Sequence, residues 1–339
     1  MDRQRAQRLF MPAAQEALQA FPVEPGSLDL VSVSENATFR VTDRHNGAAY
    51  VLRLHRPWYH THDELIAERI WIRALSAAGI SVPMPLTTRD GAEYAAVKVP
   101  EIDESRFAGL ARWTEGTLLA DVLREETDTE VVARYYAQLG AIAAAMHNQS
   151  SAWRPPAGFR RHALDIDGLM GAAPFWGPFW EHRSLSSDRQ SLLLEARDRI
   201  RGVLQGYSRS AASYGLIHAD LHPRNVIRDG ERLTVIDFDD SAFGWHAYDI
   251  AVALLPYQHT TGFAAIEESF FAGYAPIRPV ASGLREQVPI FRMIRGMVQI
   301  GWFHQRPELA LPADFDVMIA QVCTQCAAFL RDGTVSRRR

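Results

Sequence analysis

The segment from Gly215 to Asp240, GLIHADLHPRNVIRDGERLTVIDFDD, constrains the fold of this 339-residue chain more than any other stretch. β-rich runs lie on both sides of Asp229-Gly230, a dipeptide typical of two-residue hairpin turns. Such a hairpin brings Asn225 and Asp237, which flank it, to the same open end. The segment therefore predicts a polar loop followed by a β-hairpin, with two oxygen ligands close together.

These residue types suit the transfer of a phosphoryl group, a reaction that depends on positioning and charge neutralisation. Asn225 and Asp237 offer the hard oxygen ligands that Mg²⁺ prefers, while nucleotide phosphates complete its coordination. Asp220 is then left to accept the proton of an incoming hydroxyl, and His218 is expected to hold the loop. We therefore expect an ATP- and Mg²⁺-dependent phosphotransferase.

A second chemical interpretation exists, because His218-x-Asp220-x-His222 also resembles the ligand cluster of a zinc or iron hydrolase. This alternative gives no role to Asn225 or to Asp237. A single Asp in a loop is more often a turn former than a catalyst, but an ordered set of such residues is hard to explain by turns alone.

These motifs carry a family resemblance. HADLHPRN, IDFDD and the following Tyr248-Asp249-Ile250-Ala251 resemble the aminoglycoside phosphotransferase and choline kinase superfamily, which has a protein-kinase-like fold. Residues 34–41, 50–57 and 68–75 are similar to the homoserine-kinase and stress-response-kinase branches. The resemblance extends over nearly the whole chain.

The resemblance implies an α+β, two-lobed protein-kinase-like fold. We expect a small antiparallel β-sheet lobe with one main helix at 1–110, which binds the nucleotide. A hinge at 111–116 then leads to a larger, mainly helical lobe at 117–339, which carries catalysis and acceptor binding. The length supports this interpretation, because 339 residues exceed a comfortable single core.

Composition excludes several other classes. A net charge of -4 gives no basic footprint for nucleic acid, and the single lysine, Lys98, rules out a Walker A sequence. The charged N-terminus lacks a signal-peptide core and no apolar run is long enough to span a membrane, so we expect a cytoplasmic protein without membrane partners. Cys323 and Cys326 are expected to share a buried helix face.

In the first lobe, a strand near 28–33 and a return strand at 39–41 enclose a polar turn. The resemblance places this turn over the nucleotide phosphates, with Ser34, Asn36 and Thr38 as candidate cofactor-binding residues. The turn contains no glycine, although Ser and Asn can present backbone N–H groups in tight turns. An ordinary hairpin tip is the competing interpretation.

Arg53 and Glu68 are the next nucleotide-site candidates. Arg53 lies on a predicted strand, and Glu68 lies on the apolar stripe of a helix predicted from Asp63 to Ala78. A carboxylate on an inward face needs a partner, so we expect an Arg53–Glu68 pair that also reaches the phosphates. Kinases generally place lysine where this chain has Arg53, and a purely structural pair is the alternative.

Around the hinge, backbone groups would meet adenine, with Arg112 and Thr114 as cofactor-binding candidates. Trp113 is expected either to pack in the core or to stack on the base. His147, at the end of the next predicted helix, is expected to anchor the core or a loop.

The acceptor candidates come from aromatic segments at 175–181 and 302–304 and from the acids after Asp237. Aromatic faces with carboxylates suit an amine-bearing alcohol, amino acid or aminosugar. We therefore predict a substrate site that contains four residues: Asp239, His222, Trp180 and Trp302. The competing interpretation is that the tryptophans pack the core and that Asp239 anchors its loop.

A serine/threonine protein kinase of the stress-response type is the main functional alternative. The chain has His222 where protein-serine kinases commonly carry lysine, and no Ala-Pro-Glu follows Asp237. A nucleotide-binding pseudokinase is also open because of the arginine at position 53. A small-molecule hydroxyl acceptor is the leading prediction, with a protein substrate as the alternative.

Overall fold

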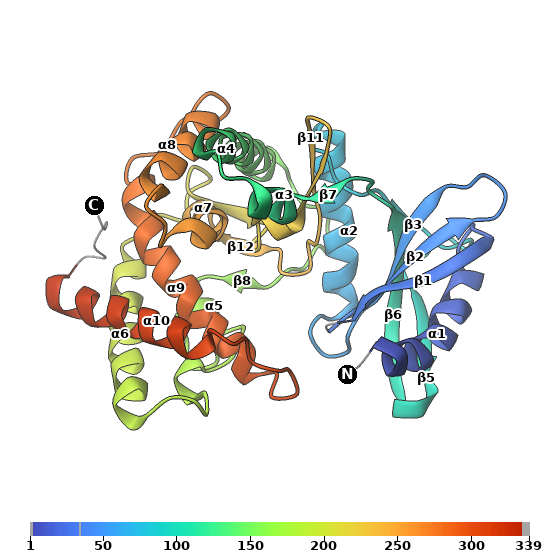
Figure 1. Ribbon diagram of the computed structural model, residues 1–339, viewed down its shortest axis with the longest axis horizontal. Helices are drawn as coiled ribbons and strands as arrows, with labels where there is room; N and C mark the ends of the chain where they lie inside the picture. Colours follow the sequence, from blue (N-terminus) through green and yellow to red (C-terminus); the bar gives the residue numbers. More distant parts are fainter. Residues whose placement is uncertain (1–2, 34, 334–339) are drawn as a thin grey trace. The chain divides into compact units, whose positions relative to one another are not determined.

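The computed structural model describes residues 3–33 and 35–333, which form two compact units (Figure 1). Unit 1 comprises the chain up to Leu119 together with Pro155–Arg161 and Arg224–Asp239. Unit 2 comprises Ala120–Arg154, His162–Pro223 and the chain from Asp240 onward. Unit 1 is built on an antiparallel sheet and unit 2 is mainly helical, which confirms the expected α+β class. The lobe boundaries and the hinge stay a prediction.

Unit 1 contains a six-stranded antiparallel sheet with the order β1-β2-β3-β6-β4, in which β5 also pairs with β6. Its strands are β1 (Pro25–Val33), β2 (Ala37–Asp43), β3 (Ala49–Leu54), β4 (Pro85–Leu86), β5 (Ala95–Val99) and β6 (Glu104–Arg112). The predicted Asn46-Gly47 turn joins β2 to β3. Gly47 has a φ of 68°, a conformation that glycine adopts without steric cost.

The main core of unit 1 lies between this sheet and α1 (Arg3–Gln19). Burial alternates along β2, where Phe39 and Val41 are fully buried, as expected for a strand with one face covered. The apolar face of α1, which includes Phe10, packs in the same cluster. The alternate residues of β2 and the apolar residues on one face of α1 therefore pack in a single core.

Helix α2 (His62–Ala77) is the second helix of unit 1. It begins with a capping box in which Thr61 and Glu64 satisfy each other's backbone amides. Its buried stripe includes Leu65, Ile72 and Leu75, and Glu68 is also buried, at 6% exposure. The predicted helix and the inward direction of its carboxylate are both confirmed.

Unit 1 also contains the predicted hairpin of β10 (Val226–Asp229) and β11 (Arg232–Val235). The strands pair antiparallel in the register Val226 to Val235, and the turn glycine, Gly230, has a φ of 57°. A third strand, β7 (Thr117–Leu118), pairs with β10. The turn chemistry therefore sets the register that brings the two ends of the hairpin together.

Unit 2 combines helices with a small three-stranded sheet of order β8-β12-β9. Its strands are β8 (Ala163–Leu164), β9 (Tyr214–Ile217) and β12 (Ala242–Trp245). Its α-helices are α3 (Leu119–Glu125), α4 (Thr129–Ala152), α5 (Ile166–Met170), α6 (Ser187–Gln205), α7 (His246–Leu254), α8 (Phe263–Tyr274), α9 (Leu284–His304) and α10 (Phe315–Asp332). Helix α7 is buried along its whole length, so it forms the centre of this unit.

Helices α4 and α8 pack closely because each presents a glycine at the contact. A Cβ on Gly140 would lie 1.9 Å from the carbonyl oxygen of Phe270, and one on Gly273 would lie 1.8 Å from that of Ala137. No other residue type fits at either position without moving a helix. None of the helices in the described ranges combines the length and the apolar character needed to cross a bilayer.

Candidate active site

The polar loop after β9 is held by hydrogen bonds to one carboxylate of α7, that of Asp249. The amide of His218 donates a hydrogen bond to Oδ2 of Asp249 at 2.9 Å, and the amide of Ala219 donates to Oδ1 at 2.6 Å. Ala219 has a φ of 66°, a conformation that is rare for a residue with a side chain. Two hydrogen bonds to a fully buried carboxylate therefore hold a strained backbone immediately before Asp220.

The environment of Asp249 explains why this anchor is rigid. Burial raises the pKa of Asp249 to about 6, while the charge of His218 and the two loop amides favour its ionised form. His147 Nε2 lies 3.4 Å from Asp249 Oδ2, and its Nδ1 lies 3.0 Å from the hydroxyl of Tyr274. Burial lowers the pKa of His147 to about 3, so this ring is neutral. His147 therefore has the anchoring position that the sequence suggested.

Asp220 carries a partner on each carboxylate oxygen. Nη2 of Arg295 donates to Oδ1 at 2.5 Å, and Nε2 of His222 lies 3.4 Å from Oδ2. The amide of Asp220 donates to Nδ1 of His218 at 3.2 Å. His218 thus contacts the loop backbone, the position that a loop-holding role requires, and His222 stays a candidate acceptor contact beside Asp220.

The predicted metal ligands lie at the open end of the β10-β11 hairpin. The amide of Ile236 donates to the carbonyl of Asn225 at 2.9 Å. Asn225 therefore lies opposite Ile236 at the end of the paired strands, and Asp237 is the next residue along the chain. Asp237 has a φ of 64°, and its side chain is 37% exposed. An amide oxygen and an accessible carboxylate fit the ligand preference of Mg²⁺, so the two residues can hold the predicted ion.

Arg53 does not pair with Glu68, and that part of the sequence interpretation is wrong. Nη1 of Arg53 instead donates to Oδ1 of Asp237 at 2.9 Å. Burial alone would lower the pKa of Arg53, but the charges of Asp237 and Asp239 raise it above its ordinary value. The guanidinium therefore faces the predicted metal ligand directly. The carboxylates of Asp237 and Asp239 together attract it more strongly than the single carboxylate of Glu68.

Glu68 is buried without such a direct contact. Burial, together with the charge of Asp239, raises the pKa of Glu68 to about 7, although Arg161 and Arg53 act in the opposite direction. A carboxyl with this pKa exchanges a proton near neutral pH.

Asp239 anchors its own turn, so its predicted place in an acceptor pocket is not supported. Its Oδ2 accepts a hydrogen bond from Nδ2 of Asn36 at 3.3 Å, and His55 and His60 lie 3.7 and 3.8 Å from its Oδ1. Its carbonyl lies 2.7 Å from His60 Nε2 and accepts from Arg161 at 2.6 Å. Burial alone would raise the pKa of Asp239, but the nearby His55 and the charges of His60 and Arg53 hold it well below its usual range.

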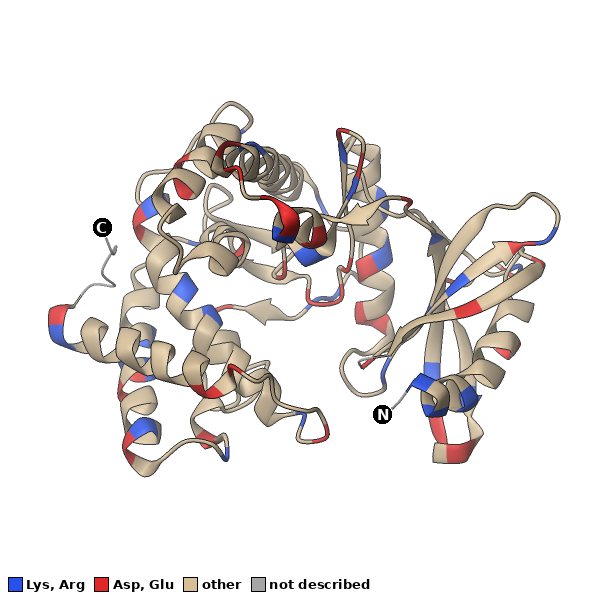
Figure 2. Cartoon of the chain, viewed as in Figure 1, with Lys and Arg blue, Asp and Glu red and all other residues tan. Residues whose placement is uncertain are grey.

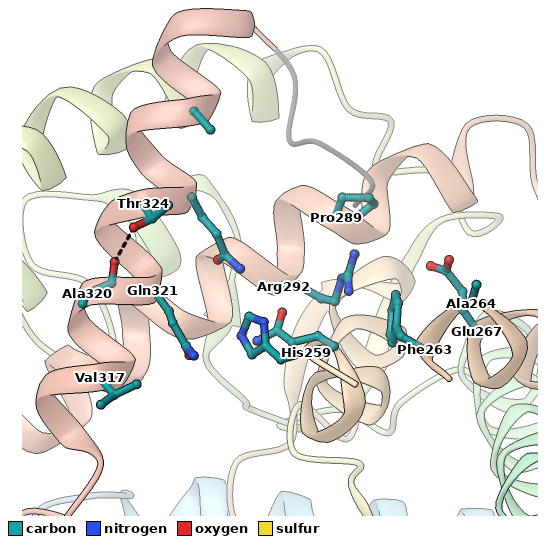
Figure 3. A pocket seen from close by; sticks show the side chains of 13 residues that line it. His259, Phe263, Ala264, Glu267, Pro289, Arg292, Val317, Ala320, Gln321 and Thr324 are labelled. Atoms are coloured by element: carbon teal, nitrogen blue, oxygen red, sulfur yellow. Dashed lines mark hydrogen bonds between the residues drawn. The ribbon is translucent and has the colours of Figure 1, made fainter. Parts of the chain in front are cut away.

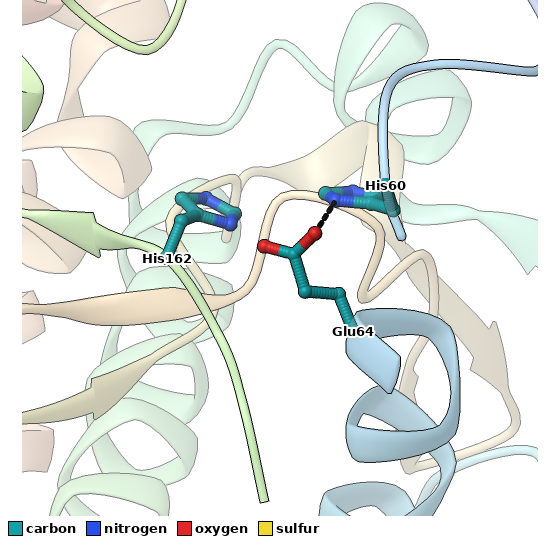
Figure 4. Close-up of side chains that lie close together, drawn as sticks. All are labelled: His60, Glu64 and His162. Atoms are coloured by element: carbon teal, nitrogen blue, oxygen red, sulfur yellow. Dashed lines mark ion pairs between the residues drawn. The ribbon is translucent and has the colours of Figure 1, made fainter. Parts of the chain in front are cut away.

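The same contacts give roles to Asn36, which precedes β2, and to His60, which lies between β3 and α2. Asn36 links Asp239 to the end of β3, because its Oδ1 accepts from the amide of Arg56 at 2.8 Å. His60 also lies beside Glu64 of α2, with His60 Nδ1 and Glu64 Oε2 4.0 Å apart (Figure 4). The 35–36 turn is therefore tied to the turn at Asp239 within unit 1.

The other cofactor candidates are less directly placed. Ser34 lies outside the described residues. Thr38 is paired with Arg53 across β2 and β3, and Arg112 lies at the exposed end of β6, with its guanidinium 5.8 Å from the ring centre of Tyr50. Thr114 is half-buried in the link from β6 to β7. Their contact with a nucleotide stays a prediction.

The two tryptophans proposed for the acceptor site make packing contacts. Trp180 is 9% exposed and packs edge-on against Phe179, with Arg197 stacked 4.6 Å from its ring centre. Trp302 is stacked by Arg306 at 4.2 Å. These contacts favour the alternative in which the aromatic segments stabilise unit 2.

Unit 2 also has a pocket of about 440 Å³ between α8, α9 and α10 (Figure 3). Its lining combines apolar and polar side chains: Gln258, His259, Phe263, Ala264, Glu267, Pro289, Arg292, Val317, Ala320, Gln321, Thr324, Gln325 and Ala328. The guanidinium of Arg292 lies 4.4 Å above the ring of Phe263. None of the acceptor candidates named from the sequence lines this pocket.

Sequence reasoning missed Arg295. This residue lies in the middle of α9, in a run of apolar residues that includes Phe291 and Ile294 and that Arg292 also interrupts. Figure 2 shows basic residues within the otherwise uncharged middle of this helix. An arginine inside an apolar stripe needs a buried partner, and that signal was available in the sequence. The identity of the partner, 75 residues away, was not.

Comparisons with known proteins agree with this geometry. Residues 30–284 match the family model described as the phosphotransferase enzyme family. An amicoumacin kinase from Bacillus subtilis is 27% identical over 271 residues, which cover 77% of this chain and 75% of the relative. A homoserine kinase from Rhizobium johnstonii is 30% identical over 228 residues, covering 64% of this chain and 61% of that relative.

A solved structure of a microcompartment-associated aminopropanol kinase is similar throughout. Its TM-score is 0.82 at 29% identity, and the match covers 96% of this chain and 99% of that one. An amicoumacin kinase in complex with AMP-PNP, Ca²⁺ and Ami has a TM-score of 0.78 at 20% identity, which shows the shared fold. From the extent of the family match and from these relatives, the chain belongs to the phosphotransferase enzyme family and is an enzyme of the small-molecule kinase type.

Proposed function

We propose that this protein transfers the γ-phosphoryl group of ATP, with Mg²⁺, to a hydroxyl group of a small molecule that also carries an amino group. The acceptor oxygen forms the new bond to phosphorus, the bond from the γ-phosphorus to its bridging oxygen breaks, and ADP leaves. The hydroxyl proton passes to Asp220. The products are a phosphate monoester and ADP.

The observation that carries this proposal is the anchoring of the loop on Asp249. Because the amides of His218 and Ala219 are both bound to this carboxylate, the backbone at Asp220 is fixed before any ligand arrives. A fixed carboxylate can orient a hydroxyl for in-line attack without reorganising during the reaction. The side chain of Asp220 is 19% exposed, so an acceptor can reach it.

The groups that handle the nucleotide charge belong to unit 1. Asn225 and Asp237 provide oxygen ligands, and Arg53 places a cation 2.9 Å from Asp237. When bound, Mg²⁺ would neutralise charge on the phosphate oxygens and polarise them. The guanidinium of Arg53 can bind phosphate oxygens in the role that lysine has in other kinases, with a forked rather than a point geometry.

The local charge in unit 2 supports a cationic acceptor. Arg295 contacts Asp220, and the charges of Asp220 and Asp240 both favour its charged form, so two carboxylates act on one guanidinium. This balance suits an ammonium group beside the reacting hydroxyl. The aminopropanol and homoserine that name two of the related kinases each contain a hydroxyl and an amino group.

A panel of acceptors tests the proposal. ADP release should be measured with ATP and Mg²⁺ in the presence of 1-amino-2-propanol, ethanolamine, L-homoserine, an aminoglycoside, or a propanediol that lacks the amine. The proposal predicts turnover that needs an acceptor and favours the amine over the matched diol. Equal rates with the diol would reject the amine requirement, and binding of ATP without turnover for every acceptor would support the pseudokinase alternative.

A further inference from the structure

The contact between Arg295 and Asp220 differs from the exposed ion pairs of this chain. Nη2 of Arg295 lies 2.5 Å from Oδ1 of Asp220, and the two side chains are 11% and 19% exposed. An ion pair on the surface, such as that between Arg285 of α9 and Glu268 of α8, is screened by water. A buried pair acts in a lower dielectric, where losing one partner leaves an uncompensated charge.

Two buried aromatic residues restrict the guanidinium of Arg295. Nη1 donates to the hydroxyl of Tyr248 at 3.3 Å, and the ring centre of Trp176 lies 5.4 Å from the guanidinium carbon. Both aromatic side chains are buried, and their rings are stacked with centres 6.3 Å apart. The arginine is therefore held by two packed rings and one hydroxyl, so its direction toward Asp220 is set before a substrate binds.

The charged and titratable groups around Asp220 come from four parts of unit 2. His218 and His222 belong to its own loop, while Tyr248 and Asp249 come from α7. Arg295 comes from α9, and Asp240, which precedes β12, acts on the same guanidinium. Among these described neighbours Arg295 carries the guanidinium, a group that stays charged in proteins.

We propose that Arg295 is a positioning residue that holds the carboxylate of Asp220 ionised and in one orientation for the acceptor hydroxyl. This inference rests on the proposed function. Arg295 lies beyond residues 30–284, the part that matches the family model, so the match itself assigns it no role. Removing the guanidinium would take the cation away from Oδ1 of Asp220, while the negative charges of Asp240 and Asp249 would stay nearby.

Two variants separate positioning from general stability. Arg295→Gln removes the charge, Arg295→Lys keeps it, and Arg285→Gln removes an exposed arginine of the same helix as the matched control. We expect Arg295→Gln to lower kcat on the order of 100-fold with the KM for ATP nearly unchanged. The acidic limb of its pH–rate profile should move upward by about one pH unit. Arg295→Lys should recover part of kcat and bring the acidic limb most of the way back to its position in the parent. Arg285→Gln should match the parent protein in both.

A second measurement does not need turnover. In protein with ¹³C-labelled aspartate carboxyls, the Asp220 signal, identified by its loss in Asp220→Asn, should titrate at higher pH in Arg295→Gln than in the parent. An unchanged titration, or a lower kcat with an unmoved acidic limb, overturns the positioning role even if the protein is a kinase. If the titration shifts between the parent and Arg295→Gln but the parent phosphorylates no acceptor, the result would support the pairing and reject the proposed function instead. If Arg295→Gln does not fold, the same comparison applies to Arg295→Lys. Lysine keeps the charge but lacks the fork of the guanidinium, so the titration should shift by a smaller amount.

Discussion

Arg53 and Asp237 form an ion pair across 184 residues of sequence, with Nη1 and Oδ1 2.9 Å apart. The pair joins a strand of the main sheet to the second residue after β11, and it places a permanent cation beside the predicted metal ligand. A nucleotide phosphate that approaches Asp237 therefore meets Arg53 as well. This relationship explains how the chain can function with arginine where other kinases use lysine.

Arg53→Met should weaken ATP binding, because both the phosphates and Asp237 lose a cation. We expect the KM for ATP to rise on the order of 10-fold or more. The KM of Arg53→Lys should lie between those of the parent and of Arg53→Met, because lysine keeps the charge but lacks the forked guanidinium. Steady-state kinetics with varied ATP provide the measurement. Arg40→Met, whose partner Glu115 is exposed, is the control and should leave the KM unchanged. A similar KM in all four proteins would exclude Arg53 from the nucleotide site.

Asp237→Asn should abolish the Mg²⁺ dependence of ATP binding. Asparagine tolerates the left-handed backbone that Asp237 adopts, so this change removes the charge with little backbone strain. We expect the affinity for Mg²⁺-ATP to fall by more than the roughly 10- to 100-fold that changes around a metal ligand cost. Calorimetric titration with and without Mg²⁺ measures the difference. Retained Mg²⁺-enhanced affinity would show that the ion is held elsewhere.

Glu68 should make the protein less stable as pH rises. Burial raises the pKa of Glu68 from 4.5 to about 7, so between these values the folded chain binds more protons than the unfolded chain. The free energy of unfolding must then fall as pH rises through this window, by about 3 kcal/mol at about 1.4 kcal/mol per pKa unit. Urea unfolding at pH 4.5 and pH 8 tests this, with Glu68→Gln as the comparison. If the parent and the variant showed the same pH dependence, folding would not raise the pKa of Glu68.

Asp249→Asn should release the loop that carries Asp220. An asparagine can accept only through its single oxygen, so one of the amides of His218 and Ala219 would face an NH₂ group. We expect a loss of stability of about 1–3 kcal/mol and a larger proportional fall in kcat than in the affinity for ATP. Asp198→Asn, an exposed substitution in α6, is the control. Unchanged kcat in Asp249→Asn would mean that the loop does not need this anchor.

Local patterns predicted the secondary structure well because turn and periodicity signals act over a few residues. Asp229-Gly230 and Asn46-Gly47 form turns as expected, and α2 has the predicted apolar stripe with Glu68 turned inward. The buried face shared by Cys323 and Cys326 in α10 was also expected. In each case the information lies within one element and its neighbour.

Partner choice between distant elements was harder to predict. Arg53 pairs with Asp237 rather than Glu68, because the final geometry of the 237–239 turn decides which carboxylate lies closest. Asp239 lies beside Asn36, His55 and His60, because residues far apart from it in sequence surround it in the fold. Periodicity shows that a charged group is buried but does not identify its partner.

The most direct test of the account is transfer of phosphate from γ-³²P-ATP to 1-amino-2-propanol or L-homoserine by the parent protein and by Asp220→Asn, with ATP binding measured in both. The account predicts a labelled phosphate ester with the parent protein. It also predicts a loss on the order of 100-fold or more in Asp220→Asn while the affinity for Mg²⁺-ATP is largely kept. Equal labelling of the acceptor by both proteins would contradict the role of Asp220 and, with it, the central claim.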